Sequence, residues 1–420
     1  MDKIRIIGGN PLSGHIRIKG AKNGALPLMA AALLTDEEVI LRDVPNLSDI
    51  RTMADILSHL GAEVSFEGGI LRIKAANIRS VEAPYDLVSK MRASFMVLGP
   101  LVGRCHLARV SLPGGCAIGT RPVDRHLYAM EQLGINIEIQ NGYVLANGKP
   151  KGGKIYFQVK TVNGTMNAIM AAVLADGVTE IINAAAEPEV TDLARCLVKM
   201  GASIQGIGTE RLVITGVEKL HGTSHTVVPD RIEAATYAIA AGITGGELYI
   251  ENSPLHLLED VVFTLCYMGL DIFEKDNGLI VKSTGLIKPT NVVTEEFPGF
   301  PTDVQAQIMA LMCFANGTSI VTENIFENRF MHVQELARMG ANIQLQGSRT
   351  AIVHGVPSLS GAQVMASDLR ASAALVLAGL AAKGETIVSR VYHLDRGYDH
   401  MEEKLRVCGA NIERIHEKAE

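Results

Sequence analysis

Hydrophobic and polar positions along the chain follow one pattern that repeats six times. In each repeat, apolar residues at helical spacing end in a hydrophobic residue and a glycine, and an alternating strand pattern follows at once. Val190, Leu193 and Leu197 show the spacing, which gives a helix one apolar stripe to pack against a sheet. The six glycines, 67 to 73 residues apart, are Gly61, Gly134, Gly201, Gly269, Gly340 and Gly409. We predict that each adopts the left-handed conformation that ends a helix.

A second, more apolar helix recurs at the same place in every repeat. Residues 166–174 and 372–380 contain almost no charge, so we expect these helices to be buried on most sides. The six helices are predicted to begin near Asn23, Met91, Thr165, Ile232, Val304 and Leu369. Each repeat therefore reads as strand, buried helix, strand, amphipathic helix, strand, strand, which predicts an α/β fold. One repeat is too small to cover its own apolar surfaces, so several must pack together.

The two ends of the chain are predicted to belong to one domain. The sixth repeat stops before its final strands, and residues 6–16 match residues 352–362 in kind. We infer that residues 1–21 complete a three-repeat domain with residues 230–420, while residues 22–229 form the other three-repeat domain. The chain then crosses between the domains twice, and we expect the active site in the cleft between them.

Composition and charge exclude several classes of protein. Hydrophobic residues make up 47% of the chain, yet no run is long enough to predict a membrane span, and the N-terminus does not resemble a signal peptide. Six scattered cysteines without a Cys-x-x-Cys motif argue against disulfides and zinc, and they fit a cytoplasmic protein. The net charge of −6 and the lack of a basic tract argue against nucleic acid as a partner, and no obligatory protein partner is evident.

Charged residues stand at the predicted helix starts in equivalent places of the repeats. The buried helices start at or beside Lys22, Arg92, Arg231, Asp303, Asp368 and Arg370, and the amphipathic helices at Arg121, Arg329 and Arg396. Equivalent positions should lie at the same end of each domain, where helix N-termini also favour negative charge. We therefore expect a polyanionic ligand. The alternative is that each arginine caps a helix or forms a local salt bridge.

Three residues are candidates for acid–base chemistry. Lys22 follows Gly20-Ala21 at a helix start, where it can bind phosphate or donate a proton. Asp303 can act as a general base or orient a hydroxyl group, and an N-cap role is compatible with this. Cys116 lies among glycines in the expected loop Leu112–Arg121, as a reactive thiol or as a stray cysteine in a turn. Motifs for phosphate loops, zinc proteases and serine hydrolases are absent, so we expect no cofactor and no metal.

Short motifs follow one another in the order typical of one enzyme family. They are Gly20–Asn23, Lys90–Ser94, Pro113–Gly119, Arg121–Asp124, Pro229–Glu233, Phe300–Asp303, Phe326–Phe330, Ser367–Arg370 and Asp395–Tyr398. Over its whole length the chain resembles the family of UDP-N-acetylglucosamine 1-carboxyvinyltransferases, the enolpyruvyl transferases of peptidoglycan synthesis and members of the EPSP synthase-like superfamily. The resemblance implies two inside-out α/β barrel domains, each of three pseudo-symmetric repeats.

The resemblance also implies a reaction and its residues. The 3′-hydroxyl of UDP-N-acetylglucosamine attacks C2 of phosphoenolpyruvate, C3 is protonated, and phosphate leaves from a tetrahedral intermediate, which is the first committed step of peptidoglycan synthesis. Asp303 would be the base and Cys116 the loop acid and the target of fosfomycin, with Lys22 as a third catalytic residue. Lys22, Arg121 and Arg396 would bind phosphoenolpyruvate, with Arg92 nearby. The sugar nucleotide would contact Asn23, Arg121, Pro122, Val123, Asp124, Arg125, Lys160, Thr161, Val162, Asn163, Asp303 and Ile325. The predicted substrate-binding set also includes Arg329, Asp368 and Arg370.

The sequence departs from the family pattern at two places, and two other functions compete. Residues 161–165 replace the usual Ser-Val-Gly-Ala-Thr type of run, and Arg125 stands where the family often has an apolar residue. One alternative is a shikimate 3-phosphate enolpyruvyl transferase, which resembles this fold and chemistry but lacks the cysteine loop. The other is a non-catalytic paralogue that binds the nucleotide sugar, against which the presence of both Lys22 and Asp303 argues.

Overall fold

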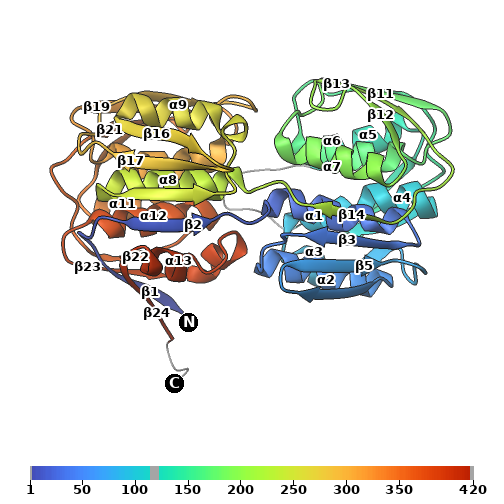
Figure 1. Ribbon diagram of the computed structural model, residues 1–420. Coiled ribbons are helices and arrows are strands. Elements are labelled where there is room, and N and C mark those ends of the chain that lie inside the picture. The colour runs from blue at the N-terminus through green and yellow to red at the C-terminus, as the bar shows by residue number, and fades with distance from the viewer. Residues whose placement is uncertain (1, 114–122, 417–420) are drawn as a thin grey trace. The chain divides into compact units, whose positions relative to one another are not determined.

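A computed structural model describes residues 2–113 and 123–416 of the chain, and these divide into two compact units (Figure 1). The first unit contains residues up to 19 and from 229 onward, and the second contains the described residues between 20 and 228. In each unit, helices fill the interior and three four-stranded sheets lie outside them. This arrangement confirms the predicted α/β fold of inside-out barrels.

The three sheets of the first unit share one topology, in which one edge strand is parallel to its neighbour and the other pairs are antiparallel. In spatial order they are β2 (Ser13–Arg17), β15 (Glu247–Glu251), β17 (Gly278–Ser283) and β16 (Leu270–Lys275); β18 (Asn291–Thr294), β19 (Thr318–Glu323), β21 (Thr350–His354) and β20 (Asn342–Gln346); and β22 (Gln363–Met365), β23 (Glu385–Ser389), β1 (Lys3–Ile7) and β24 (Asn411–Ile415).

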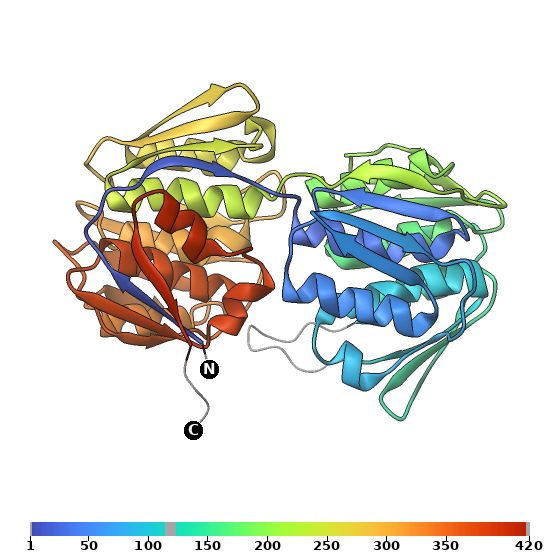
Figure 2. The same cartoon turned by 60° about the horizontal axis from the view of Figure 1, so that its bottom comes forward.

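The N-terminal segment contributes to two of these sheets. Strand β1 lies between β23 and β24, with Ile4 opposite Val388 and Ile6 opposite Ile412 (Figure 2). Strand β2 then adds a parallel edge to β15. The alternation in β1 buries Ile4 and Ile6 completely, which ties this segment to the core of the first unit.

Three helices fill the interior of the first unit and three flank them. The inner ones are α8 (Arg231–Thr244), α10 (Gln305–Met312) and α12 (Leu369–Ala381), and the others are α9 (Glu259–Met268), α11 (His332–Arg338) and α13 (Met401–Val407). Short 3₁₀ turns precede several of them: η3 (Leu255–Leu257), η4 (Thr302–Val304) and η5 (Val391–Arg396). Every residue of α12 from 370 to 380 is buried, and many are alanine, which lets the helices approach closely. No helix in residues 2–113 or 123–416 is long and apolar enough to cross a membrane.

The second unit repeats the same architecture. Its sheets are β14 (Thr223–Thr226), β3 (Glu38–Arg42), β5 (Ile70–Lys74) and β4 (Glu63–Glu67); β6 (Glu82–Ala83), β7 (Leu107–Ser111), β9 (Tyr143–Asn147) and β8 (Asn136–Gln140); and β10 (Lys154–Tyr156), β11 (Val178–Ile182), β13 (Arg211–Thr215) and β12 (Ser203–Gln205). Its helices are α1 (Lys22–Ala31), η1 (Ala32–Leu34), α2 (Ser48–Leu60), α3 (Tyr85–Val88), η2 (Arg92–Val97), α4 (Leu98–Cys105), α5 (Asp124–Gln132), α6 (Val162–Ala172) and α7 (Pro188–Lys199).

The helix-ending glycines confirm the predicted repeat. All six have a positive φ: 111° at Gly61, 78° at Gly134, 103° at Gly201, 106° at Gly269, 94° at Gly340 and 98° at Gly409. The starts of two amphipathic helices agree less closely with the sequence prediction. Helix α11 begins three residues after Arg329, and α13 begins five residues after Arg396. Arg329 therefore lies in the segment before α11, and Arg396 ends the 3₁₀ turn η5 that precedes α13.

Substitutions at two of these glycines can distinguish the cost of backbone strain from the cost of a steric clash. A Cβ atom at Gly269 would lie 2.4 Å from the backbone oxygen of Leu286, whereas a Cβ atom at Gly340 would meet nothing within 4 Å. We expect Gly340→Ala to lower the free energy of unfolding by about 1 kcal/mol. The only cost is that alanine must adopt the left-handed conformation, which is strained for a residue with a Cβ atom. Gly269→Ala should cost at least twice as much, because a backbone carbonyl must also move.

Urea denaturation of the two variants, followed by circular dichroism, measures the difference. The two glycines have nearly equal φ values, so each variant controls for the other. Equal losses of stability would show that the contact with Leu286 relaxes freely.

Candidate active site

The carboxylate of Asp303 lies at the centre of a buried charge cluster in the first unit. Arg329 Nη2 donates a hydrogen bond to Asp303 Oδ1 at 2.7 Å, and Arg370 Nη2 donates to Oδ2 at 3.0 Å. The two arginine side chains are each 6% exposed, whereas the Asp303 side chain is 27% exposed. Each carboxylate oxygen is thus held by one arginine, and the carboxylate still reaches solvent.

Burial and charge act in opposite directions on this cluster. Burial alone raises the pKa of the Asp303 carboxyl, but Arg370 and Arg329 together lower that pKa well below its ordinary value. Burial likewise lowers the pKa of the Arg370 guanidinium, and Asp303 more than reverses this, so that the pKa lies above its ordinary value. Both groups are therefore ionised at neutral pH, and Asp303 is a hydrogen-bond acceptor of fixed orientation.

Local structure explains how these residues come together. Asp303 is the middle residue of η4, which leads into α10. Arg370 is the second residue of α12, and Asp368 caps this helix by accepting from the backbone N–H groups of Arg370 and Ala371 at 2.9 and 3.0 Å. Arg329 precedes α11. The N-cap interpretation of Asp303 is wrong, because its carboxylate binds two guanidinium groups and η4 has no side-chain cap.

Neutral polar side chains from two inner helices and from the segment after η5 support the cluster. The Tyr398 hydroxyl accepts a hydrogen bond from Arg370 Nη1 at 3.3 Å and lies 2.9 Å from Thr236 Oγ1. Gln307 Nε2 lies 3.2 Å from the same hydroxyl and donates to the backbone oxygen of Asp303 at 2.9 Å. Sequence reasoning missed Thr236 and Gln307, because neutral residues inside apolar helices carry no local signal. Tyr398 was noticed only as part of a motif.

His332 adds a neutral ring beside the charges. It is 2% exposed, and burial is the main cause that lowers its pKa to about 4. The charge of Arg329 lowers the pKa further, while Asp368 opposes the shift. Its Nε2 atom is buried without a hydrogen-bond partner among the described residues. The ring is therefore uncharged at neutral pH and adds no positive charge beside Arg329.

Two further predicted residues of the first unit lie on neighbouring segments. The backbone N–H of Ile325 donates to the Glu323 carboxylate at 2.9 Å, and the hydroxyl of Thr302, next to Asp303, donates to the same carboxylate at 2.9 Å. Arg396 is the last residue of η5, directly after Asp395, which pairs with Arg414 at 2.6 Å.

In the second unit, Lys22 is the first residue of α1 and is followed by Asn23. Lys22 Nζ lies 3.1 Å from Asp49 Oδ2 on α2, and the two side chains are 12% and 5% exposed. Sequence reasoning missed Asp49, because only the packing of α1 against α2 brings it to the lysine. The ion pair fixes the direction of the Lys22 ammonium group.

The segments predicted to contact the nucleotide meet at the starts of α5 and α6. Val123 is the N-cap residue of α5, and Asp124 is its first residue. Arg125 Nη1 donates to the backbone oxygen of Lys160 at 3.2 Å, and Lys160 forms an ion pair with Glu210. Thr161 then caps α6 by accepting from the N–H of Gly164 at 3.2 Å, and residues 162 and 163 open the helix. One N–H group of the Arg125 guanidinium is thus satisfied by a backbone carbonyl.

Arg92 opens η2 and faces a second neutral histidine. Burial lowers the pKa of His126 to about 4, and the charge of Arg92 contributes to this shift. His126 Nδ1 lies 2.8 Å from Asn167 Nδ2, an amide nitrogen that can only donate, so this ring nitrogen is the acceptor. Three other predicted residues, Cys116, Arg121 and Pro122, lie outside the described residues.

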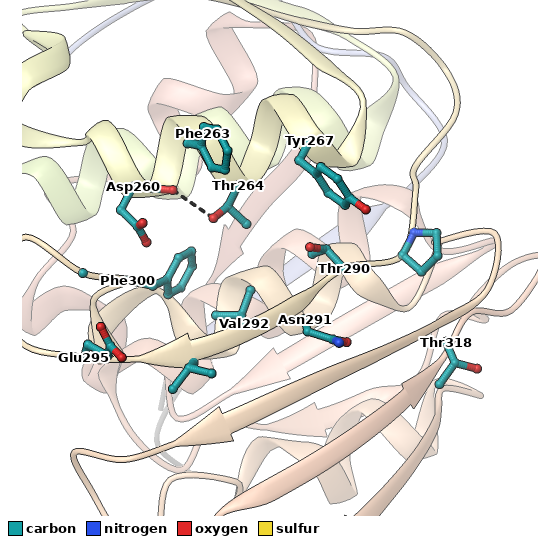
Figure 3. Close-up of a pocket in the computed structure, with 13 residues that line it drawn as sticks. Asp260, Phe263, Thr264, Tyr267, Thr290, Asn291, Val292, Glu295, Phe300 and Thr318 are labelled. Atoms are coloured by element: carbon teal, nitrogen blue, oxygen red, sulfur yellow. Dashed lines mark hydrogen bonds between the residues drawn. The ribbon is translucent and has the colours of Figure 1, made fainter.

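A hollow of about 650 Å³ in the first unit lies between α9 and β18 (Figure 3). Phe263, Tyr267 and Phe300 contribute aromatic rings to it, and Asp260 and Glu295 contribute carboxylates. Burial, together with the charge of Glu295, raises the pKa of Asp260. Two carboxylates repel a polyanion, so this hollow does not suit the ligand that the arginines predict.

The buried His332 predicts how stability depends on pH. Its pKa falls from 6.5 to about 4 on folding, so the unfolded chain binds a proton that the folded chain excludes. Stability should decrease as the pH falls through this window, by about 2 kcal/mol between pH 7.5 and pH 5 for this one residue. His332→Gln should reduce the dependence of the urea midpoint on pH. The exposed His256→Gln is the matched control, and an equal slope in both variants would contradict the assignment.

The chain is similar to known proteins over nearly its whole length. Residues 6–405 match the family described as EPSP synthase (3-phosphoshikimate 1-carboxyvinyltransferase). The UDP-N-acetylglucosamine 1-carboxyvinyltransferase of Paramagnetospirillum magneticum is 56% identical over 427 residues, which cover 99% of each chain. That of Granulibacter bethesdensis is 56% identical over 419 residues, covering 99% of this chain and all of the relative.

Comparison with solved structures shows that the fold is similar as well. The enolpyruvyl transferase NikO from Streptomyces tendae superposes with a TM-score of 0.88 at 26% identity over 98% of both chains. EPSP synthase from Acinetobacter baumannii gives a TM-score of 0.75 at 16% identity over 99% of this chain and all of that one, which shows the fold alone. By its similarity to full-length relatives, the chain belongs to the UDP-N-acetylglucosamine 1-carboxyvinyltransferase family, within the EPSP synthase family.

Proposed function

We propose that this chain transfers the enolpyruvyl group of phosphoenolpyruvate to the 3′-hydroxyl of UDP-N-acetylglucosamine, releasing phosphate, in cytoplasmic peptidoglycan synthesis. The main support is 56% identity, across nearly the whole chain, to relatives that carry the name of this activity. A solvent-reaching carboxylate held by two buried arginines supports it further, because this arrangement suits a hydroxyl beside an anion.

The charges of both units suit these two anionic substrates. In the first unit, Arg329 and Arg370 lie in the described cluster, and Arg396 ends η5. In the second unit, Lys22 opens α1 and Arg92 opens η2. Guanidinium groups bind phosphate and carboxylate through paired hydrogen bonds, and helix N-termini add partial positive charge. We assign phosphoenolpyruvate to Lys22, Arg92 and Arg396, together with Arg121 from the sequence.

Asp303 receives the proton of the attacking hydroxyl in this proposal. The arginines that orient its carboxylate also lower its pKa, which makes it a weak base. A weak base is sufficient once the hydroxyl oxygen bonds to C2, because that oxygen then becomes positively charged and its proton acidic. Protonation of C3 accompanies this attack and gives the tetrahedral intermediate. Loss of a proton from C3 then expels phosphate and restores the double bond.

The proton donor to C3 is assigned from the sequence. Cys116 is the thiol of the family motif, and in its protonated form it can supply this proton. Lys22 is held by Asp49 at the start of α1 and supplies one of the positive groups for the phosphate. The sugar nucleotide is assigned to Asn23, Ile325 and the segments 123–125 and 160–163.

Acceptor specificity is the direct test of the function. Purified protein should release phosphate from phosphoenolpyruvate when UDP-N-acetylglucosamine is present and show no release above background with shikimate 3-phosphate. A colorimetric phosphate assay measures both reactions. Release with shikimate 3-phosphate alone would favour the competing transferase, and release with neither acceptor would favour a non-catalytic binding protein. Either result would overturn the proposal.

Substitution of Asp303 tests its role as acceptor of the proton. Asp303→Asn keeps the shape of the side chain but removes the negative charge, and we expect kcat to fall at least 100-fold. Asp271→Asn on β16 is the matched control, because Asp271 is exposed and lies outside the cluster. If kcat for Asp303→Asn stays within threefold of the control, Asp303 is not the base.

A further inference from the structure

Glu323 ends strand β19 with a carboxylate that is completely removed from solvent. A buried carboxylate is costly unless hydrogen bonds satisfy its oxygens. Oε1 accepts from the Thr294 hydroxyl at 2.9 Å and from the backbone N–H groups of Ile325 and Phe326 at 2.9 and 3.0 Å. Oε2 accepts from the Thr302 hydroxyl at 2.9 Å. The four donors come from three segments, and the two that contain Thr302 and Ile325 carry proposed substrate contacts.

One arm of this network, which begins with the hydrogen bond accepted by Oε2, leads to Asp303. A hydroxyl group has one proton, and the Thr302 hydroxyl donates that proton to Glu323. The lone pairs of the Thr302 oxygen are therefore left to accept a hydrogen bond from Arg329 Nη1 at 3.1 Å. The same guanidinium donates through Nη2 to Asp303 at 2.7 Å. These two hydrogen bonds fix the plane of the Arg329 guanidinium. Glu323 therefore orients, through one hydroxyl proton, the arginine that holds Asp303.

The other arm, which consists of the hydrogen bonds accepted by Oε1, fixes the turn that carries Ile325. The Thr294 hydroxyl donates to Glu323 and accepts from the backbone N–H of Asn324 at 3.0 Å. Together with the two N–H groups bound directly by Glu323, three successive backbone donors are thereby fixed. Arg349 Nη1 binds the backbone oxygens of Glu323 and Asn324 at 3.1 and 2.9 Å. The turn after β19 is thus held through both its N–H groups and its carbonyl groups.

The equivalent strand of the neighbouring repeat shows that the fold does not require this arrangement. Strand β15 also ends in a glutamate, Glu251, but its side chain is 29% exposed and lies 2.8 Å from His15 Nε2. A buried glutamate with four hydrogen bonds is therefore not a consequence of the repeat alone. At Glu323, this buried carboxylate connects the segments that carry Asp303 and Ile325.

We propose that Glu323 is a positioning residue for the acceptor hydroxyl. One carboxylate oxygen orients Arg329 and Asp303 through Thr302, and the other sets the turn of Ile325. This inference rests on the proposed function, in which Asp303 and Ile325 hold UDP-N-acetylglucosamine. Glu323 acts through these neighbours and does not contact the reacting atoms.

Conservative substitutions separate the two arms. In Glu323→Gln, the amide oxygen must face the two backbone N–H groups, so the amide NH₂ faces Thr302 and the hydroxyl proton of Thr302 loses its acceptor. Thr302→Val removes the hydroxyl at nearly constant volume, and Thr302→Ser restores it. Thr294→Val affects only the arm of Ile325. Glu251→Gln is the matched control at the end of β15.

Steady-state kinetics with both substrates give the test. We expect Glu323→Gln to lower kcat/KM for UDP-N-acetylglucosamine by about 10- to 100-fold, with KM for phosphoenolpyruvate within twofold of the unsubstituted protein. Thr302→Val should lower mainly kcat, by about 10-fold, and Thr302→Ser should recover it to within threefold. Thr294→Val should raise mainly KM for the sugar nucleotide. A general loss of structure would not produce this split between substrates.

The outcomes distinguish this inference from the proposed function. If the unsubstituted protein does not turn over the two substrates, the proposed function fails. If it does, and Glu323→Gln and Thr302→Val both stay within twofold of Glu251→Gln, the positioning role is wrong. Equal changes in KM for both substrates would overturn it as well. Circular dichroism verifies folding, and the Thr302 pair decides the question if Glu323→Gln does not fold.

Discussion

The first unit depends on keeping one partly exposed carboxylate and two buried guanidinium groups together. Burying such charges costs several kcal/mol per ion unless pairing and hydrogen bonds compensate. Asp303 and Arg329 come from the repeat of α10 and α11, Arg370 comes from α12, and the Thr236 hydroxyl in the supporting layer comes from α8. All three repeats of the unit therefore contribute to one cluster. Removal of Asp303 would leave both guanidinium groups without the carboxylate that pairs them.

The inside-out architecture allows this cluster to exist. In a barrel with its sheets outside, the inner helices run side by side, and their N-terminal segments meet at one end. Alanine-rich helices such as α12 permit a close approach, because they bring little side-chain volume between the backbones. Polar groups can then collect at the helix starts while the rest of each helix stays apolar. The same arrangement in the second unit places Lys22, Arg92 and Thr161 at the starts of α1, η2 and α6.

Sequence reasoning worked where the signal is local or repeated. The helix-ending glycines follow from a positive φ that glycine adopts without strain, and the charged helix starts follow from the repeat. Asp303, Arg329 and Arg370 were therefore predicted as members of one site. Thr236, Gln307 and Glu323 were not, because each also depends on a partner at least 20 residues distant in the chain. Neutral or buried polar residues become visible only when the packing of the helices is known.

The sequence by itself determined the repeat, the α/β class, the family and the residue types of the site, because hydrophobic spacing and short motifs are properties of neighbouring residues. Only the tertiary structure decided how the charges are used. It gave each oxygen of Asp303 its own arginine, paired Lys22 with Asp49, and excluded the alternative N-cap role of Asp303. These outcomes depend on contacts between helices distant in sequence, where burial strengthens each charge interaction and makes an unpaired group costly.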